Sequence, residues 1–374
     1  MLQPDLAFTR ELLHRRHHLS QQQIDDLLGE KGESSLADKL RLMDKLQQML
    51  HLFRIFHEKD IWFMLLKGPL LSQRIYDDPC YRYYGDFDIL VKPGDVQQVA
   101  QLLVAEGFQP DYFDWPQNKS RQKRVTGYMN QYTLYHDQRD ISIEIHWRLF
   151  KYCIIPNRLF QDLLDKEVEK TTLGGQVFWQ FRHEMELLYL VIHGGIHAWW
   201  RLKWLVDIHE MLARFPLKEQ KFLTLTRQLK AHRQVALCNA LLERVFAHTP
   251  LLPHQGKSSR FLLHYALERM QDKNDNPHEN LRYFWRRQRY RMTIMPGIRY
   301  KISTYKLSAF SQRDMHHPYL PPIGLVVIFR RFYLRLKQLF DPAKKPKTQS
   351  PSNHEPPQPN ENDSQRQNHF WPTS

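Results

Sequence analysis

The sequence predicts an α+β protein whose small mixed β-sheet core is flanked by helices. Short apolar runs near 61–66 and 87–92 are typical of buried strands. Polar and apolar residues alternate across 131–149, and the apolar spacing becomes helical from about residue 183. A helical N-terminal segment is therefore expected before the sheet and a helical domain after it.

The composition is that of a folded, globular chain. It has 374 residues, of which 42% are hydrophobic and 25% charged, which excludes a fully disordered chain or a collagen-like fibre. The three cysteines are far apart and have no zinc-binding spacing, which indicates a reducing compartment. No segment has the pattern of a signal peptide or a membrane span, so we expect a cytoplasmic protein.

The first half of the chain passes from helices to strands. Apolar residues recur at helical spacing between Leu36 and Leu50. The apolar run 61–66 predicts a strand that turns at Lys67-Gly68 into a helix over 69–76, where Pro69 is tolerated in the first turn. A second strand is expected at 87–91, and Pro93-Gly94-Asp95 opens a helix that ends at Gly107.

A hairpin is expected from segments 131–137 and 141–150. In the second segment isoleucines alternate with polar residues, and a strand repeats its side-chain direction every two residues. The three isoleucines therefore belong to one face and the three polar residues to the other: Ile141, Ile143 and Ile145 against Ser142, Glu144 and His146.

Helices return after residue 182. Two consecutive helices are expected over 184–200 and 201–215, with Gly194-Gly195 as a weak point in the first, and more helices through about 273. The last 34 residues hold seven prolines among polar residues and predict a disordered tail. The predicted divisions are an N-terminal helical segment (1–58), a core (59–182), a helical domain (183–340) and the tail (341–374).

Three carboxylates are the candidate catalytic and metal-binding residues. Asp86 and Asp88 lie two residues apart in a predicted strand and so share a face. Glu144 lies on the polar face of another strand. Such oxygen ligands suit Mg²⁺, or Mn²⁺, and a pair of ions stabilises both the attacking and the leaving oxygen of a phosphoryl transfer. The alternative is that the two aspartates merely mark a solvated sheet edge.

Two blocks of residues resemble an uncharacterised bacterial nucleotidyltransferase family within the DNA polymerase β-like superfamily. The resemblance covers roughly 60–215. The first block is Leu66-Lys67-Gly68, Tyr76-Asp77-Asp78-Pro79, Arg82, Gly85-Asp86-Phe87-Asp88-Ile89-Leu90-Val91 and Ile143-Glu144-Ile145-His146-Trp147. The second is His193, His197, Trp200-Arg201-Leu202-Lys203-Trp204 and Asp207. Lys67-Gly68-Pro69 stands where the wider superfamily has Gly-Ser or Gly-Gly.

The resemblance implies a nucleotidyltransferase core that transfers a nucleoside monophosphate from an NTP to an acceptor hydroxyl. Lys67, Gly68 and Arg82 would bind the nucleotide phosphates, although a structural salt bridge from Arg82 to Asp86 or Asp88 is an equal alternative. Further cleft-lining residues would be His146, His193, His197, Arg201, Lys203 and Asp207. The alternative function is a non-catalytic nucleotide-binding or scaffold protein of the same fold.

The segment 281–340 carries thirteen Lys and Arg residues against one acid, Asp314. Aromatic residues are interleaved with these charges, a pattern that suits an anionic membrane surface or an acidic partner. A solvated basic helix is the simpler alternative. Nucleic acid ranks below both, because no nucleic-acid motif is present. The segment would place the protein at the inner face of the membrane as a peripheral protein.

Overall fold

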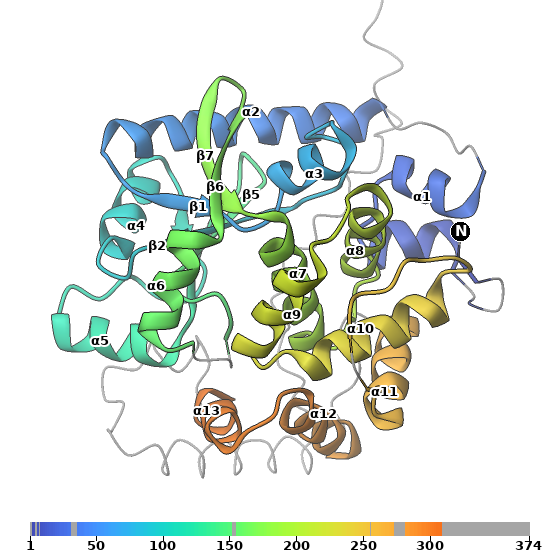
Figure 1. Cartoon of the computed structure of the whole chain (residues 1–374). Coiled ribbons are helices and arrows are strands. Elements are labelled where there is room, and N and C mark those ends of the chain that lie inside the picture. The colour runs from blue at the N-terminus through green and yellow to red at the C-terminus, as the bar shows by residue number, and fades with distance from the viewer. Residues whose placement is uncertain are drawn as a thin grey trace, which may run out of the picture. The chain divides into compact units, whose positions relative to one another are not determined.

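The structure is a computed structural model, and it describes residues 2–3, 6, 8–30, 36–151, 155–254, 256–272 and 281–308 (Figure 1). The described helices and strands belong to one compact unit that spans residues 1–331. Most of the basic segment beyond residue 308 and the predicted tail (341–374) lie outside the described residues. No helix of the described ranges is long and apolar enough to cross a membrane.

A mixed sheet is the centre of the fold. Among the described residues it has seven strands in the order β3-β4-β5-β2-β1-β7-β6. The pairs β2–β5 and β1–β7 are parallel and the other pairs antiparallel. This confirms the predicted α+β class. The strands are β1 (Phe63–Leu65), β2 (Asp86–Val91), β3 (Gln109–Pro110), β4 (Gln131–His136), β5 (Ile141–His146), β6 (Val168–Leu173) and β7 (Gln176–Phe181).

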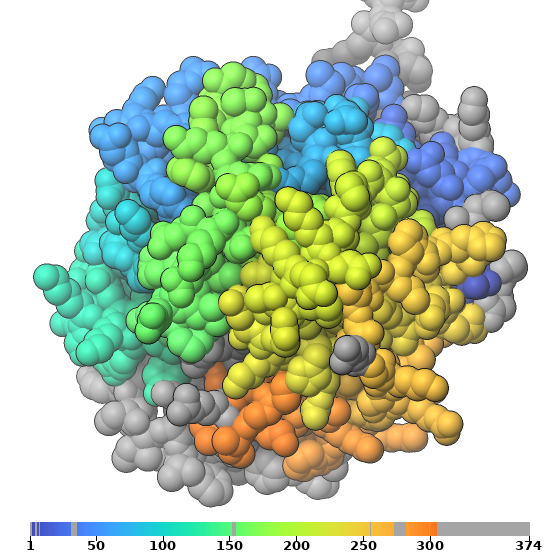
Figure 2. Space-filling model, in the orientation of Figure 1, coloured from blue at the N-terminus to red at the C-terminus, as the bar shows by residue number. Residues whose placement is uncertain are grey.

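The hairpin β6–β7 is absent from the sequence prediction. Its turn consists of Gly174 and Gly175, both with positive φ (56° and 75°), which only glycine adopts without strain. The hairpin lies across α2 (Leu36–Glu58), where the Gln176 side chain donates a hydrogen bond of 2.7 Å to the Leu50 carbonyl (Figure 2). The Gly-Gly pair between two segments of alternating residues would therefore have predicted this hairpin.

The sheet separates two hydrophobic cores. Phe87 and Ile89 of β2 and the three isoleucines of β5 pack into the first core with α2 and α4 (Val96–Ala105). This confirms the predicted isoleucine face. Leu90, which follows Ile89 in β2, packs into the second core with the helices after residue 182, and so do Met64 and Leu66, which alternate with Phe63 and Leu65 of the first core. Asp86, Asp88, Glu144 and His146 therefore share a face with the helical core.

Helices cover both cores. The second core contains the predicted helical part of the chain: α7 (His183–Ile196), α8 (Lys203–Arg214), α9 (Glu219–Gln228), α10 (His232–Val245), α11 (Arg260–Gln271) and α12 (Leu281–Ile294). The remaining helices are η1 (Leu12–Arg16), α1 (Gln21–Leu28), α3 (Pro69–Tyr76), α5 (Lys119–Tyr128), α6 (Asn157–Lys166) and α13 (Ile298–Ser308).

The turn between α7 and α8 differs from the prediction. We expected a helix through residue 200, but α7 ends at Ile196 and the chain reverses at Ala198 and Trp199, both with positive φ. Gly194 does not break the helix. It makes room for the Trp199 ring, because a Cβ on Gly194 would lie 2.5 Å from that ring. The turn brings residues 200–204 to the open part of the sheet face.

Candidate active site

A cavity of about 570 Å³ opens between the polar face of the sheet and the helices α7, α8 and α12. Its lining combines carboxylates with basic and aromatic side chains. Eleven of the twelve residues selected from the sequence line it, and only Asp207 does not: Lys67, Gly68, Arg82, Asp86, Asp88, Glu144, His146, His193, His197, Arg201 and Lys203.

Strand register brings the carboxylates together. β2 and β5 are parallel neighbours, and Asp88 lies directly opposite Glu144 in the register. Asp86 lies opposite Ser142, one step along the same face. Asp88 and Glu144 are 56 positions apart in the chain, and the parallel pairing makes them neighbours.

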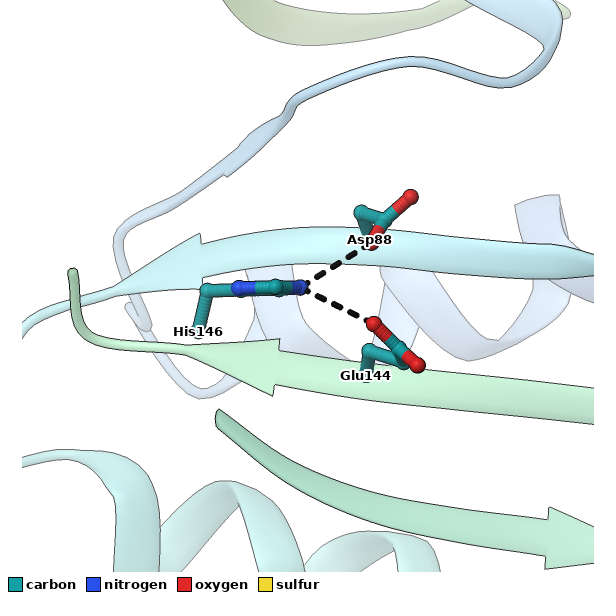
Figure 3. A group of neighbouring side chains, drawn as sticks. All are labelled: Asp88, Glu144 and His146. Atoms are coloured by element: carbon teal, nitrogen blue, oxygen red, sulfur yellow. Dashed lines mark hydrogen bonds and ion pairs between the residues drawn. The ribbon is translucent and has the colours of Figure 1, made fainter. Parts of the chain in front are cut away.

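His146 joins the two opposing carboxylates. Its Nε2 lies 3.0 Å from Asp88 Oδ1 and 3.2 Å from Glu144 Oε2 (Figure 3). One potential ligand atom from each of the three residues lies within 4.8 Å of the others. Two carboxylate oxygens at this spacing fit a divalent cation, and the imidazole nitrogen adds a ligand only when His146 has lost its proton. Asp86 is not part of this group but lines the same cavity.

Lys67 is the second cation beside Asp88. Its Nζ lies 2.9 Å from Asp88 Oδ2 and 3.4 Å from His193 Nε2. The backbone fixes this contact, because Leu66 N–H donates a hydrogen bond of 3.0 Å to the Asp88 carbonyl. Burial alone lowers the pKa of Lys67, but the neighbouring Asp88 carboxylate outweighs it and raises that pKa above its usual value.

The protonation states of Lys67, Asp88, Glu144 and His146 depend on one another. Burial raises the pKa of Asp88, but Lys67 and His146 outweigh it and hold that pKa well below its usual range. Burial lowers the pKa of His146, yet the hydrogen bonds to Asp88 and Glu144 raise it to about 9. Burial raises the pKa of Glu144. At neutral pH an ionised Asp88 therefore lies between a charged lysine and a charged imidazole.

Residues 12–247 match the model of a protein family described as "Uncharacterised nucleotidyltransferase". The match begins in η1, ends after α10 and covers more than half of the chain. The chain belongs to this family. Membership implies a nucleotide substrate and confirms the resemblance drawn from the two sequence blocks. No curated protein and no solved structure matches the chain.

His193 and His197 form one wall of the nucleotidyltransferase cavity. Their ring centroids are 4.6 Å apart, and each ring contacts Trp204, at 5.1 and 5.4 Å. Burial and then Lys67 lower the pKa of both rings, to about 3 for His197. Both histidines are therefore neutral. They are not part of the metal-ligand group found among the described residues.

Arg82 has a structural partner, though not either of those expected. Its Nε and one terminal nitrogen donate to the two carboxylate oxygens of Asp207, at 2.7 and 2.9 Å. The Arg82 and Asp207 side chains are 2% and 0% exposed. The expectation that Asp207 lines the cavity is wrong, because the carboxylate lies behind Arg82 on the buried face of α8. The pair fixes α8 to the loop that leads into β2.

Several cavity residues were missed from the sequence. Tyr189 of α7 and Lys151 after β5 have no local motif. Arg287 and Arg291 were noticed, but only as part of a basic segment that faces an anionic surface. In the structure both line the cavity, while Arg286 pairs with Glu268 of α11. The four-residue spacing of Arg287 and Arg291 indicates that both lie on one face of a helix. It does not indicate what that face contacts.

Proposed function

We propose that this nucleotidyltransferase-family protein catalyses metal-dependent transfer of a nucleoside monophosphate from an NTP to an acceptor hydroxyl, with release of pyrophosphate. The observation that carries the proposal is the pairing of Asp88 with Glu144 on neighbouring strands, in a cavity otherwise rich in cations. Two opposed carboxylates in a cavity offer the hard oxygen ligands that a divalent cation takes together with substrate phosphates, and Lys67 and His146 balance their charge in the state described here.

Asp86, Asp88 and Glu144 would hold the divalent cations, Mg²⁺ or Mn²⁺. Divalent cations at such a site neutralise phosphate charge and stabilise both the attacking and the leaving oxygen. The protonated imidazole of His146 lies between Asp88 and Glu144 and keeps both carboxylates pointed into the cavity. It also balances their charge in the state described here.

Lys67 and Gly68 would bind the phosphates of the nucleotide. Gly68 precedes the first residue of α3 and has φ of 75°, which favours glycine. The N–H groups of the first turn of α3 have no side-chain cap. They form the positive end of the helix dipole. We assign Arg82 a positioning role, because its buried pair with Asp207 holds α8.

Glu144 would accept the proton of the acceptor hydroxyl. Burial raises its pKa, which makes the carboxylate a better base than an exposed glutamate. The hydrogen bond of 3.2 Å from His146 orients it in the cavity. Proton acceptance and phosphate binding would then take place on the same face of the sheet.

The test is pyrophosphate release from each of the four NTPs with Mg²⁺ or Mn²⁺, with a small-molecule cell extract as the source of acceptor. We expect release by the wild type and a loss of at least 100-fold in Asp88→Asn and Glu144→Gln. Asp165→Asn, on the exposed part of α6, is the matched control and should behave as wild type. Nucleotide binding without release by the wild type would instead favour the non-catalytic alternative.

A further inference from the structure

The wall of the cavity that α8 and α12 form is strongly basic. Lys203 is the first residue of α8 and Arg201 lies two residues before it, while Arg287 and Arg291 lie one turn apart on α12. Lys151, which follows β5, adds a fifth positive charge to the lining. These residues line the same cavity as the carboxylates of β2 and β5, and Asp86 lies close enough to favour the charged form of Lys203. We call them the basic wall.

Lys203 is the central observation. Its residue is 5% exposed, and it lines the cavity. Its ammonium makes no hydrogen bond and no ion pair with any other residue that the structure describes. A buried ammonium group without a partner is unfavourable, so it is normally neutralised or paired. An anionic ligand in the cavity would supply the missing partner.

Charged groups of both signs surround Lys203: Arg82 and Arg201 oppose its positive charge, whereas Asp86 and Asp207 favour it. Burial, followed by Arg82 and Arg201, lowers the pKa of Lys203 well below its usual value. Arg82 is itself neutralised by Asp207. An anion in the cavity would therefore favour the protonated, ammonium form of Lys203.

The first turn of α8 also favours an anion in the cavity. α8 has twelve residues and begins at Lys203, with no side-chain cap at its N-terminus. Uncapped N–H groups at a helix start attract oxyanions. Arg201 lies over the Trp200 ring at 4.3 Å, which orients its guanidinium at the cavity. A planar guanidinium binds two oxygens of a phosphate at once.

α12 closes the basic wall from the other side. The helix packs against α7 and α11. Burial and then Lys67, Lys151, Arg291 and Arg201 lower the pKa of His197, so four cations from different parts of the chain act on one buried ring. These cations thus converge on the same part of the cavity.

We propose that the basic wall binds a phosphate group through Lys203, Arg201, Arg287 and the start of α8. The inference deepens the proposed function and, as a statement about substrate, rests on it. The phosphate would come from one of two sources, the polyphosphate tail of the nucleotide or a phosphate carried by the acceptor. Several cations and a helix start match a multiply charged oxyanion better than a single carboxylate.

The experiment is a calorimetric titration of the full chain with inorganic pyrophosphate, without divalent metal. We expect Lys203→Met and Arg287→Gln each to weaken binding by at least tenfold. Arg282→Gln removes the same charge from an exposed position of α12 and should bind as wild type. Wild-type affinity in both cavity variants would overturn the proposal.

Thermal stability separates a ligand-binding role of Lys203 from a structural one. Lys203→Met replaces a buried amine that makes no hydrogen bond or ion pair with the described residues, so its Tm should equal or exceed that of the wild type. A fall of several degrees would show that the ammonium stabilises the fold, and would contradict our reading of it. Arg287→Gln tests the basic wall independently of that result.

Competition identifies the source of the phosphate. The titration is repeated with Mg²⁺ and a saturating non-hydrolysable NTP. Retained, Lys203-dependent pyrophosphate binding assigns the basic wall to the acceptor, whereas full competition assigns it to the nucleotide tail. Because the first titration uses neither metal nor turnover, it is independent of the transfer reaction. Asp88→Asn should lose transfer activity but keep Lys203-dependent pyrophosphate binding.

Discussion

Replacing Asp207 by Asn should strongly destabilise the protein, although the two side chains have nearly the same shape. Asp207 accepts two hydrogen bonds from Arg82, and both side chains are almost fully inaccessible to water. The amide cannot balance the guanidinium charge, and its NH₂ group would oppose one of the Arg82 donors. Lys203, close to Arg82, makes an unbalanced charge there still less favourable.

The expected cost follows from the burial of the pair. Leaving one partner of a buried ion pair uncompensated costs about 3–5 kcal/mol of unfolding free energy. Glu210, on the same helix, pairs with Arg214 four residues later at 3.3 Å, but both are partly exposed. An exposed pair of this spacing contributes about 0.3–0.5 kcal/mol. Glu210→Gln is therefore the matched control, with roughly a tenth of the effect.

Urea denaturation followed by tryptophan fluorescence measures both variants. A third variant, Arg82→Met with Asp207→Leu, replaces the pair by apolar side chains of similar size. It should be more stable than Asp207→Asn, because no charge is left buried. An Asp207→Asn cost below about 1 kcal/mol, similar to Glu210→Gln, would refute the assignment of this pair as the anchor of α8.

Two further predictions concern His146 and Gly194. The folded pKa of His146, about 9, lies above its unfolded value, so the protonated ring stabilises the metal-free protein below pH 6.5, and this is lost as pH rises through 9. Thermal melts without divalent metal should show about 2–3 kcal/mol less stability at pH 9.5 than at pH 6.5, and His146→Gln should flatten the curve; equal slopes would contradict this. Gly194→Ala should cost about 1–3 kcal/mol, because the new methyl group would meet the Trp199 ring, and a shift in tryptophan emission should accompany it; wild-type stability would show that the ring moves freely.

The sequence predicted the local features of the site. Alternation in 141–146 assigned Glu144 and His146 to the face opposite the isoleucines, and the two cores of the structure confirm that face. The i, i+2 spacing placed Asp86 and Asp88 on one side of a strand. Strand periodicity is a local property, and this is why a single sequence suffices to read it.

Pairings between distant residues were not predictable. The partner of Arg82 lies 125 positions later in the chain. The sequence left two equal alternatives for Arg82, phosphate binding or a salt bridge to Asp86 or Asp88, and neither named Asp207. The turn at Ala198 and Trp199 also escaped prediction, since it depends on a ring packing against a glycine. Both features arise from tertiary packing, which overrides local spacing.

The sequence did not predict that Arg287 and Arg291 line the cavity, because this too depends on tertiary packing. A basic helix with aromatic residues has the same pattern whether it lies on a membrane or closes a cavity. Only the packing of α12 on α7 and α11 decides between these environments for the part that the structure describes. The membrane or acidic-partner prediction for the rest of the segment stays a prediction.

Direct titration with Mn²⁺, followed by the loss of its free electron-paramagnetic-resonance signal, tests the central claim that the carboxylate face binds a divalent cation. In the presence of a non-hydrolysable NTP, the wild type and Asp165→Asn should bind Mn²⁺ with the same affinity. Asp88→Asn and Glu144→Gln should bind it at least tenfold more weakly, because each removes a charged oxygen ligand. Unchanged Mn²⁺ affinity in both variants, with the fold intact, would contradict the assignment of this face as the metal site.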